Sequence, residues 1–176
     1  MQFGDPSRFA IRCVHEPILN ETARVFGRMC IIVGGQQLGD FNEPACMLNV
    51  TEGHLQAVLR RLSNLFDPAF DELADVALYR LLSRALYESD ERTSEQVAAD
   101  AERYFKFDFL TNGGESFDRF RSFICLSKGR VKILFADASD VPIVANVEAE
   151  YFAETVAAFL SWLSAEGEAS CGTRPS

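Results

Sequence analysis

Hydrophobic and polar positions alternate near the start of the chain, which is the pattern of β-strands. Residues 9–15 have every second side chain apolar, and residues 25–33 form a more continuous apolar run typical of a deeply buried strand. The dipeptide Gly34-Gly35 suits a two-residue hairpin turn that requires positive φ, and residues 36–38 would then return as a short strand. Residues 46–50 are a further strand candidate.

After position 50 the apolar spacing becomes helical, and three helices are expected. Thr51 would be the N-cap of the first helix, and Asp67 followed by Pro68 would end it and begin the second. The third helix would begin at Thr93, with Gln96 completing a capping box, and run to about Tyr104. The first two apolar stripes are Leu55, Val58, Leu59, Leu62 and Leu65, and then Phe70, Leu73, Ala77, Leu78, Leu81 and Ala85.

Strand patterns return in the second half of the chain. Residues 105–109 alternate phenylalanine with other residues, and three further strands are predicted at 121–126, 130–135 and 142–147. Because short turns separate the last three, they should pair antiparallel. A final helix over residues 149–165 should stop near Gly167.

The order of strands, three helices, strands and one helix predicts an α+β fold with a largely antiparallel sheet covered by helices. A chain of 176 residues can bury roughly 70% of its unfolded surface in a single core. We therefore expect one α+β domain over residues 1–166, followed by a flexible C-terminal tail over 167–176.

The charge is strongly acidic and unevenly distributed. With 26 acidic residues against 17 Lys and Arg, the net charge is −9, which disfavours direct binding to nucleic acid or to an anionic membrane and favours a basic partner. Residues 67–104 hold ten acidic residues and four arginines, a net of −6. This segment is either a solvated helix face or a docking surface. Its acidic residues are Asp67, Asp71, Glu72, Asp75, Glu88, Asp90, Glu91, Glu95, Asp100 and Glu102.

No local motif predicts catalysis, a cofactor or a metal. The two histidines, His15 and His54, lack metal-ligand spacing, and the glycine pairs lack a phosphate-binding pattern. The five cysteines contain no C-x-x-C pair, so we expect reduced thiols without disulfides. An enzyme would need a cleft that brings a histidine together with a cysteine or carboxylate. No signal peptide and no apolar run of about 20 residues is present, which predicts a cytoplasmic protein.

Several short segments carry a resemblance to a known family. They are FGDPSRFAI at 3–11, FGRMCIIVGG at 26–35, LGDF at 38–41, ESFD at 115–118 and RVKI at 130–133. In this order, over residues 1–162, the chain resembles the immunity protein 42 family, whose members are encoded beside toxins in bacterial polymorphic toxin systems. The resemblance implies a cytoplasmic immunity protein that binds and neutralises a cognate toxin.

Physical reasoning adds an expected mechanism and interface. Neutralisation should be stoichiometric occlusion rather than catalysis, and the acidic segment 67–104 would face a basic active-site cleft of the toxin. The competing docking surfaces are the open face of the sheet and the loop 111–120. The alternative function is an acidic secretion chaperone, a dimer that holds an unfolded effector segment. The sequence leaves the oligomeric state open.

Overall fold

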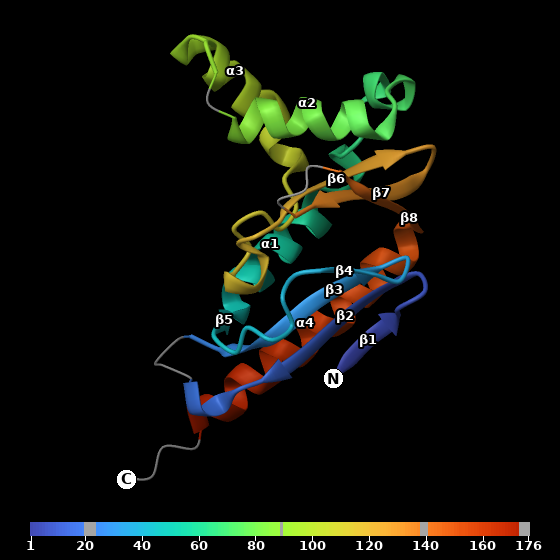
Figure 1. Cartoon of the computed structure of the whole chain (residues 1–176). Helices are drawn as coiled ribbons and strands as arrows, with labels where there is room; N and C mark the ends of the chain where they lie inside the picture. Colours follow the sequence, from blue (N-terminus) through green and yellow to red (C-terminus); the bar gives the residue numbers. More distant parts are fainter. Residues whose placement is uncertain (20–23, 89, 138–140, 173–176) are drawn as a thin grey trace.

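The computed structural model describes residues 1–19, 24–88, 90–137 and 141–172, with side chains as far as residue 167. It contains two antiparallel sheets and four α-helices in the described part of the chain, so the predicted α+β class is confirmed. The sheets lie one above the other in Figure 1, joined by α1 (Leu48–Arg61). The helix α4 (Ala149–Gly172) runs along the first sheet.

The first sheet is built from the N-terminal strands. Its central strand β3 (Phe26–Val33) pairs with β2 (Phe9–His15) on one side and with both β4 (Gln36–Leu38) and β5 (Cys46–Met47) on the other, while β1 (Gln2–Asp5) pairs with β2. The predicted hairpin turn between β3 and β4 is confirmed, since both of its glycines have positive φ. The edge strand β1 was missed because only four residues form it.

Aromatic side chains hold α4 against this sheet. Phe9 of β2 contacts Phe152 of α4, with ring centroids 4.8 Å apart. Phe3 of β1 contacts both Phe159 and Trp162 further along the helix, at 6.0 and 5.8 Å. Aromatic side chains therefore form the interface that packs α4 against the first sheet.

The second sheet has the strand order β6 (Arg121–Ser127), β7 (Arg130–Ala136) and β8 (Ile143–Glu148), and all pairs are antiparallel as predicted. The helices α2 (Asp75–Tyr87) and α3 (Ser94–Tyr104) lie above it, away from the first sheet (Figure 1). Tyr79 of α2 packs edge-on against Phe123 of β6, at 5.4 Å between ring centroids. The capping box predicted at the start of α3 is confirmed.

Two predictions around α1 are wrong. Only Cys46–Met47 of the expected strand 46–50 is extended, because α1 begins at Leu48. Thr51 is not an N-cap: it lies inside α1, fully buried, and its hydroxyl donates to the carbonyl oxygen of Gly113 at 2.5 Å. The Thr51 hydroxyl therefore binds a distant loop, whereas the local pattern predicted that it caps the helix.

Four further predictions need correction. Asp67 and Pro68 do begin a helix, but it is the 3-10 helix Pro68–Glu72, and α2 starts separately at Asp75. The expected strand 105–109 is the 3-10 helix Phe105–Phe107 followed by an isolated bridge to β6. The final helix continues past Gly167 to Gly172. Ala77, expected in the buried stripe of α2, is exposed.

Candidate functional site

The acidic segment forms a helical layer that ion pairs and hydrogen bonds anchor to the second sheet. The ammonium of Lys132 on β7 donates to Asp75 at 2.7 Å, and the hydroxyl of Ser127 on β6 donates to Asp71 at 2.6 Å. The guanidinium of Arg121 lies 4.0 Å from Glu88. Bases from outside the segment thus compensate part of its net charge.

Eight of the ten acidic residues form two groups at the ends of α2, and the other two, Asp100 and Glu102, lie further along α3. Asp67, Asp71, Glu72 and Asp75 lie at or before its first residue, and Glu88 to Glu95 follow its last one. At 1.5 Å per residue, the 13 residues of α2 separate these groups by about 20 Å. The end of α3 returns to the first group, because Arg103 lies 3.5 Å from Asp67. The segment is therefore not one continuous acidic patch.

Arg92, which lies between α2 and α3, organises the second acidic group. Its guanidinium donates to Asp90 at 2.6 Å and to Asp100 of α3 at 2.5 Å. It also donates to backbone carbonyls near the end of α2, those of Arg84, Ala85 and Glu88. Hydrogen bonds from Arg84 and Arg92 hold the pKa of the Asp90 carboxyl well below its usual range.

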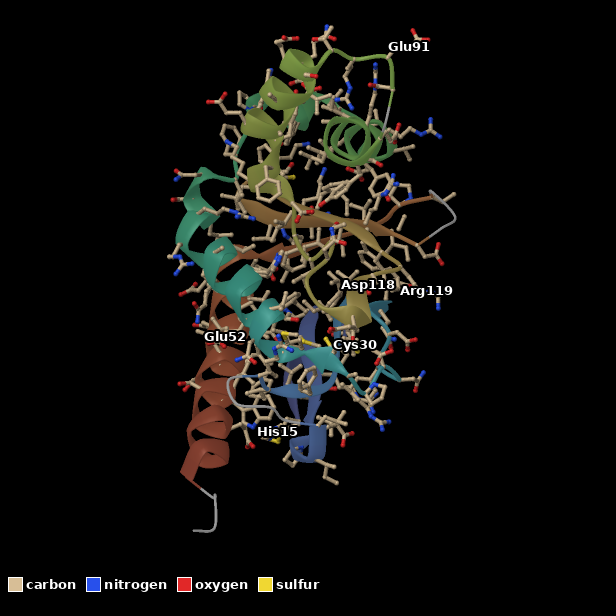
Figure 2. All side chains as sticks on the ribbon, turned by 90° about the vertical axis from the view of Figure 1, so that its left-hand side faces the viewer. His15, Cys30, Glu52, Glu91, Asp118 and Arg119 are labelled. Atoms are coloured by element: carbon tan, nitrogen blue, oxygen red, sulfur yellow. The ribbon has the colours of Figure 1, made fainter. Side chains whose placement is uncertain are left out.

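The remaining acidic residues are exposed, and of these Glu95 accepts hydrogen bonds from its own backbone and from the Thr93 side chain. Glu72, Glu91, Glu95 and Glu102 are exposed and form no ion pair with a described residue. Figure 2 shows Glu91 at the extreme tip of the loop that joins α2 and α3. Uncompensated negative charge therefore concentrates on this loop and on the outer surface of α3.

A groove of about 370 Å³ lies between α2 and α3. Its apolar lining comes from Leu81 and Ala85 of α2 and from Ala99 and Tyr104 of α3. Arg84, Arg92, Gln96 and Asp100 supply the polar lining. No sequence motif marks this groove, because it depends on the packing of two helices and on the conformation of the loop between them.

The two histidines lie on separate elements. His15 of β2 faces Glu166 of α4, with 2.9 Å between Nδ1 and a carboxylate oxygen, whereas His54 of α1 lies 3.3 Å from the carbonyl oxygen of Phe109. Cys13, the thiol nearest to His15 in sequence, is buried, and burial raises its pKa to about 12. A thiol that stays protonated at neutral pH is a poor nucleophile.

The described residues show neither a metal-ligand group nor a membrane-spanning helix. In the part of the chain with described side chains, no three His, Cys, Asp or Glu residues come together in a group that could hold a metal ion. None of the described helices combines the length and apolar composition that crossing a membrane requires. Cys13, Cys30, Cys46 and Cys125 are buried free thiols, and the side chain of Cys171 lies outside the described residues.

The described part of the chain thus has an α+β fold in which an exposed acidic helical layer with a small groove rests on antiparallel sheets. The family model described as Immunity protein 42 matches residues 1–162, and the chain belongs to this family. It is therefore an immunity protein, and its partner is a cognate toxin, which it neutralises. The resemblance expected from the short segments is confirmed.

Two other comparisons concern solved structures and curated proteins. Among solved structures, CdiI from Burkholderia dolosa AUO158 has a similar fold, with a TM-score of 0.69 and 17% sequence identity. The match covers 92% of this chain and 99% of that one. At this identity, the likeness shows a shared fold. A search of curated proteins finds no match.

Proposed function

We propose that this immunity protein neutralises its cognate toxin by stoichiometric binding through the acidic surface of α2, α3 and the segment before them, so that a basic cleft of the toxin is occluded. The observation that carries the proposal is the exposed, uncompensated acidic charge on this surface, with Glu91 at its tip (Figure 2). Long-range attraction between such a surface and a basic cleft would speed association.

The proposed place of action is the cytoplasm, and the proposed mechanism is not enzymatic. Buried thiols without C-x-x-C spacing suit a reducing compartment. The separate positions of His15 and His54 favour binding over catalysis. Family membership gives no support to the secretion-chaperone alternative.

Charge reversal at matched positions tests the interface. We would compare Glu91→Lys/Glu95→Lys, Glu72→Lys/Glu102→Lys and, as a control on α4, Glu150→Lys/Glu154→Lys. Each double variant changes the net charge by the same amount at exposed positions. Association with the toxin encoded by the neighbouring gene is measured by surface plasmon resonance at low and physiological salt.

The first variant should lower the association rate constant about tenfold at low salt, with a smaller effect on dissociation. The second variant should also slow association if both acidic groups face the toxin. The α4 control should change little, because exposed charges beyond about 10 Å are screened at physiological salt. Equal slowing by all three variants, or by none, would refute the acidic interface. The docking surface would then be the open sheet face or the 111–120 loop, where Asp118 and Arg119 are exposed (Figure 2).

A further inference from the structure

The groove between α2 and α3 differs from the acidic surface around it because its base is apolar. Leu81 and Ala85 of α2 face Ala99 of α3, and the ring of Tyr104 lines it as well. Ala85 and Tyr104 are themselves almost completely buried, so the base is part of the packed helix interface. A volume of about 370 Å³ is suited to one or two inserted side chains rather than to a whole element.

The charged residues that line the groove form ion pairs. Arg84 pairs with Asp90, which lies outside the lining, at 2.8 Å, and Arg92 pairs with Asp100 of the lining at 2.5 Å, so carboxylates balance both arginines. Only one carboxylate oxygen of Asp100, Oδ2, is occupied by Arg92; its Oδ1 accepts no hydrogen bond from a described residue. The Asp100 side chain is 34% exposed and can therefore accept a further donor.

Charge beyond this lining favours a cation. The exposed carboxylates of Glu91 and Glu95 lie on the loop and first turn of α3, next to Arg92 and Gln96 in sequence, and form no ion pair with a described residue. The carboxylates of Glu91, Glu95 and Asp100 would repel an anionic occupant of the groove. They would attract a cationic one. The groove thus combines an apolar lining with exposed carboxylates on the neighbouring loop and first turn of α3.

We infer that this groove receives a lysine or arginine side chain of the cognate toxin, flanked there by apolar residues. The aliphatic part of that side chain would lie on Leu81 and Ala99, and its charged end would donate to Oδ1 of Asp100, as long cationic side chains commonly do at apolar surfaces with a polar rim. This inference rests on the proposed function and gives it an anchor point for the toxin.

The anchor and the acidic rim have different kinetic roles. A side chain held in a desolvated pocket at the centre of an interface mainly sets the dissociation rate, whereas exposed rim charges mainly set the association rate. Blocking the groove should therefore affect dissociation, and the effect should persist at high salt because it does not depend on long-range attraction.

Adjacent alanines on α3 allow a matched test. Ala99 lines the groove and Ala98 does not, yet both are exposed in the same helix. We would compare Ala99→Trp with Ala98→Trp, and Ala99→Lys with Ala98→Lys, after circular dichroism and thermal melting of each variant. Binding of the toxin encoded by the neighbouring gene is measured by surface plasmon resonance at 50 and 300 mM salt, values of the order that changes ionic screening strongly.

Both substitutions at Ala99 should raise the dissociation rate constant about tenfold or more at both salt concentrations, with association nearly unchanged for Ala99→Trp. The Ala98 variants should dissociate like the unaltered protein. The lysine pair keeps the test valid if tryptophan perturbs folding, because lysine is a good helix former at an exposed site.

Unchanged dissociation for a folded Ala99→Lys variant would overturn the groove as an anchor, as would equal weakening by the Ala98 variants. The proposed function has a separate outcome. If the groove variants bind normally while Glu91→Lys/Glu95→Lys slows association, the acidic interface stands without the anchor. If the unaltered protein neither binds the toxin nor abolishes its activity, the proposed function itself fails.

Discussion

At the scale of single residues, Arg92 determines how α2 ends and how α3 is placed. Its side chain is 11% exposed and donates to two carboxylates and three backbone carbonyls. The last carbonyls of a helix lack partners within it, and here a guanidinium supplies donors to several of them. No glycine closes α2, so this arginine replaces the usual C-terminal motif.

Replacing Arg92 by lysine should lower stability, because an ammonium cannot reproduce the planar set of donors that reaches both helices. The expected result is a lower denaturation midpoint in urea, with faster proteolysis in the α2–α3 loop. Arg80→Lys is the matched control, since Arg80 is exposed on α2 and has no ion-pair partner among the described residues. Equal midpoints for the two variants would show that Arg92 contributes no more than a surface charge.

Asp108 is a second residue that joins separate elements. Its carboxylate accepts a hydrogen bond from the Tyr87 hydroxyl of α2 at 2.6 Å, and its carbonyl oxygen accepts one from Arg61 of α1 at 2.8 Å. The residue is 4% exposed, and burial raises the pKa of its carboxyl despite the nearby His54 and Arg61. The carboxylate therefore carries a desolvation cost at neutral pH.

The sign of the pH dependence follows from this shift. Because the pKa of Asp108 is higher in the folded state, the folded protein binds more protons just above pH 4, and this group lowers stability as pH rises through that interval. Asp108→Asn removes the charge and keeps an oxygen for Tyr87. Its stability relative to the unaltered protein should therefore increase between pH 4 and pH 7, as measured by urea denaturation at each pH. A constant difference would contradict the assigned pKa shift.

The hydroxyl of Tyr87 provides a separate prediction. Tyr87→Phe leaves the buried Asp108 carboxylate without this donor, which should cost about 1–3 kcal/mol of unfolding free energy at pH 7. The same substitution made in the Asp108→Asn background should cost less, because a neutral amide is less expensive to leave unsatisfied. A double-mutant cycle from urea denaturation measures the coupling, and additive effects would show that the hydrogen bond contributes nothing specific.

At the scale of elements, success of the sequence-based predictions depended on how local the determining interaction is. The Gly34-Gly35 turn and the Thr93–Gln96 capping box involve residues within three positions of each other, and both were predicted correctly. Thr51 was assigned wrongly because its partner, Gly113, lies 62 positions away.

The region 105–109 shows a second reason for failure. Its alternating phenylalanines have strand-like spacing, yet Phe107 packs on Phe70 at 4.7 Å and only Asp108 forms a bridge to β6. Phe105 is exposed, whereas Phe107, Asp108 and Phe109 are all buried, so burial does not alternate along this segment. Periodicity over five residues cannot distinguish these arrangements, because alternating residue types do not fix which side chains are buried.

The helix α3 should be the least stable of the described helices. Its 11 residues bury only Tyr104, whereas isolated helices shorter than about 12–15 residues are marginal in water. We expect its amides to exchange faster than those of α1 in hydrogen–deuterium exchange mass spectrometry. Thr93→Ala should speed exchange further by removing the cap, with a cost of about 1 kcal/mol, and Thr93→Ser should not. Equal protection of α1 and α3 would be inconsistent with this account.

At the scale of the whole molecule, charge counting located a candidate surface but not its geometry. The ten acidic residues of segment 67–104 were treated as one patch, whereas the structure separates those before α2 from those after it. Lys132 and Arg121, which partly compensate them, come from strands more than 30 positions further along the chain. The groove likewise depends on tertiary packing, which explains why composition and local charge could not reveal it.

The mechanism of neutralisation can be tested on the intact protein. Occlusion by a bound protein consumes one immunity protein for each toxin molecule, whereas an enzyme that modifies the toxin would turn over. A fixed amount of toxin, well above the dissociation constant, is titrated with this protein, and residual toxin activity is measured after short and long incubation. We expect a linear decrease that reaches zero at a constant molar ratio, independent of time.

Recovery of activity distinguishes the two mechanisms a second time. Toxin released from the complex by denaturation and refolded alone should regain its activity, because occlusion leaves its covalent structure unchanged. The control is toxin carried through the same treatment without the immunity protein. Occlusion would be refuted if much less than one immunity protein per toxin molecule inactivated all of the toxin, with inactivation increasing during incubation. A permanent change in the mass of the recovered toxin would also refute occlusion, because only a covalent reaction could produce it.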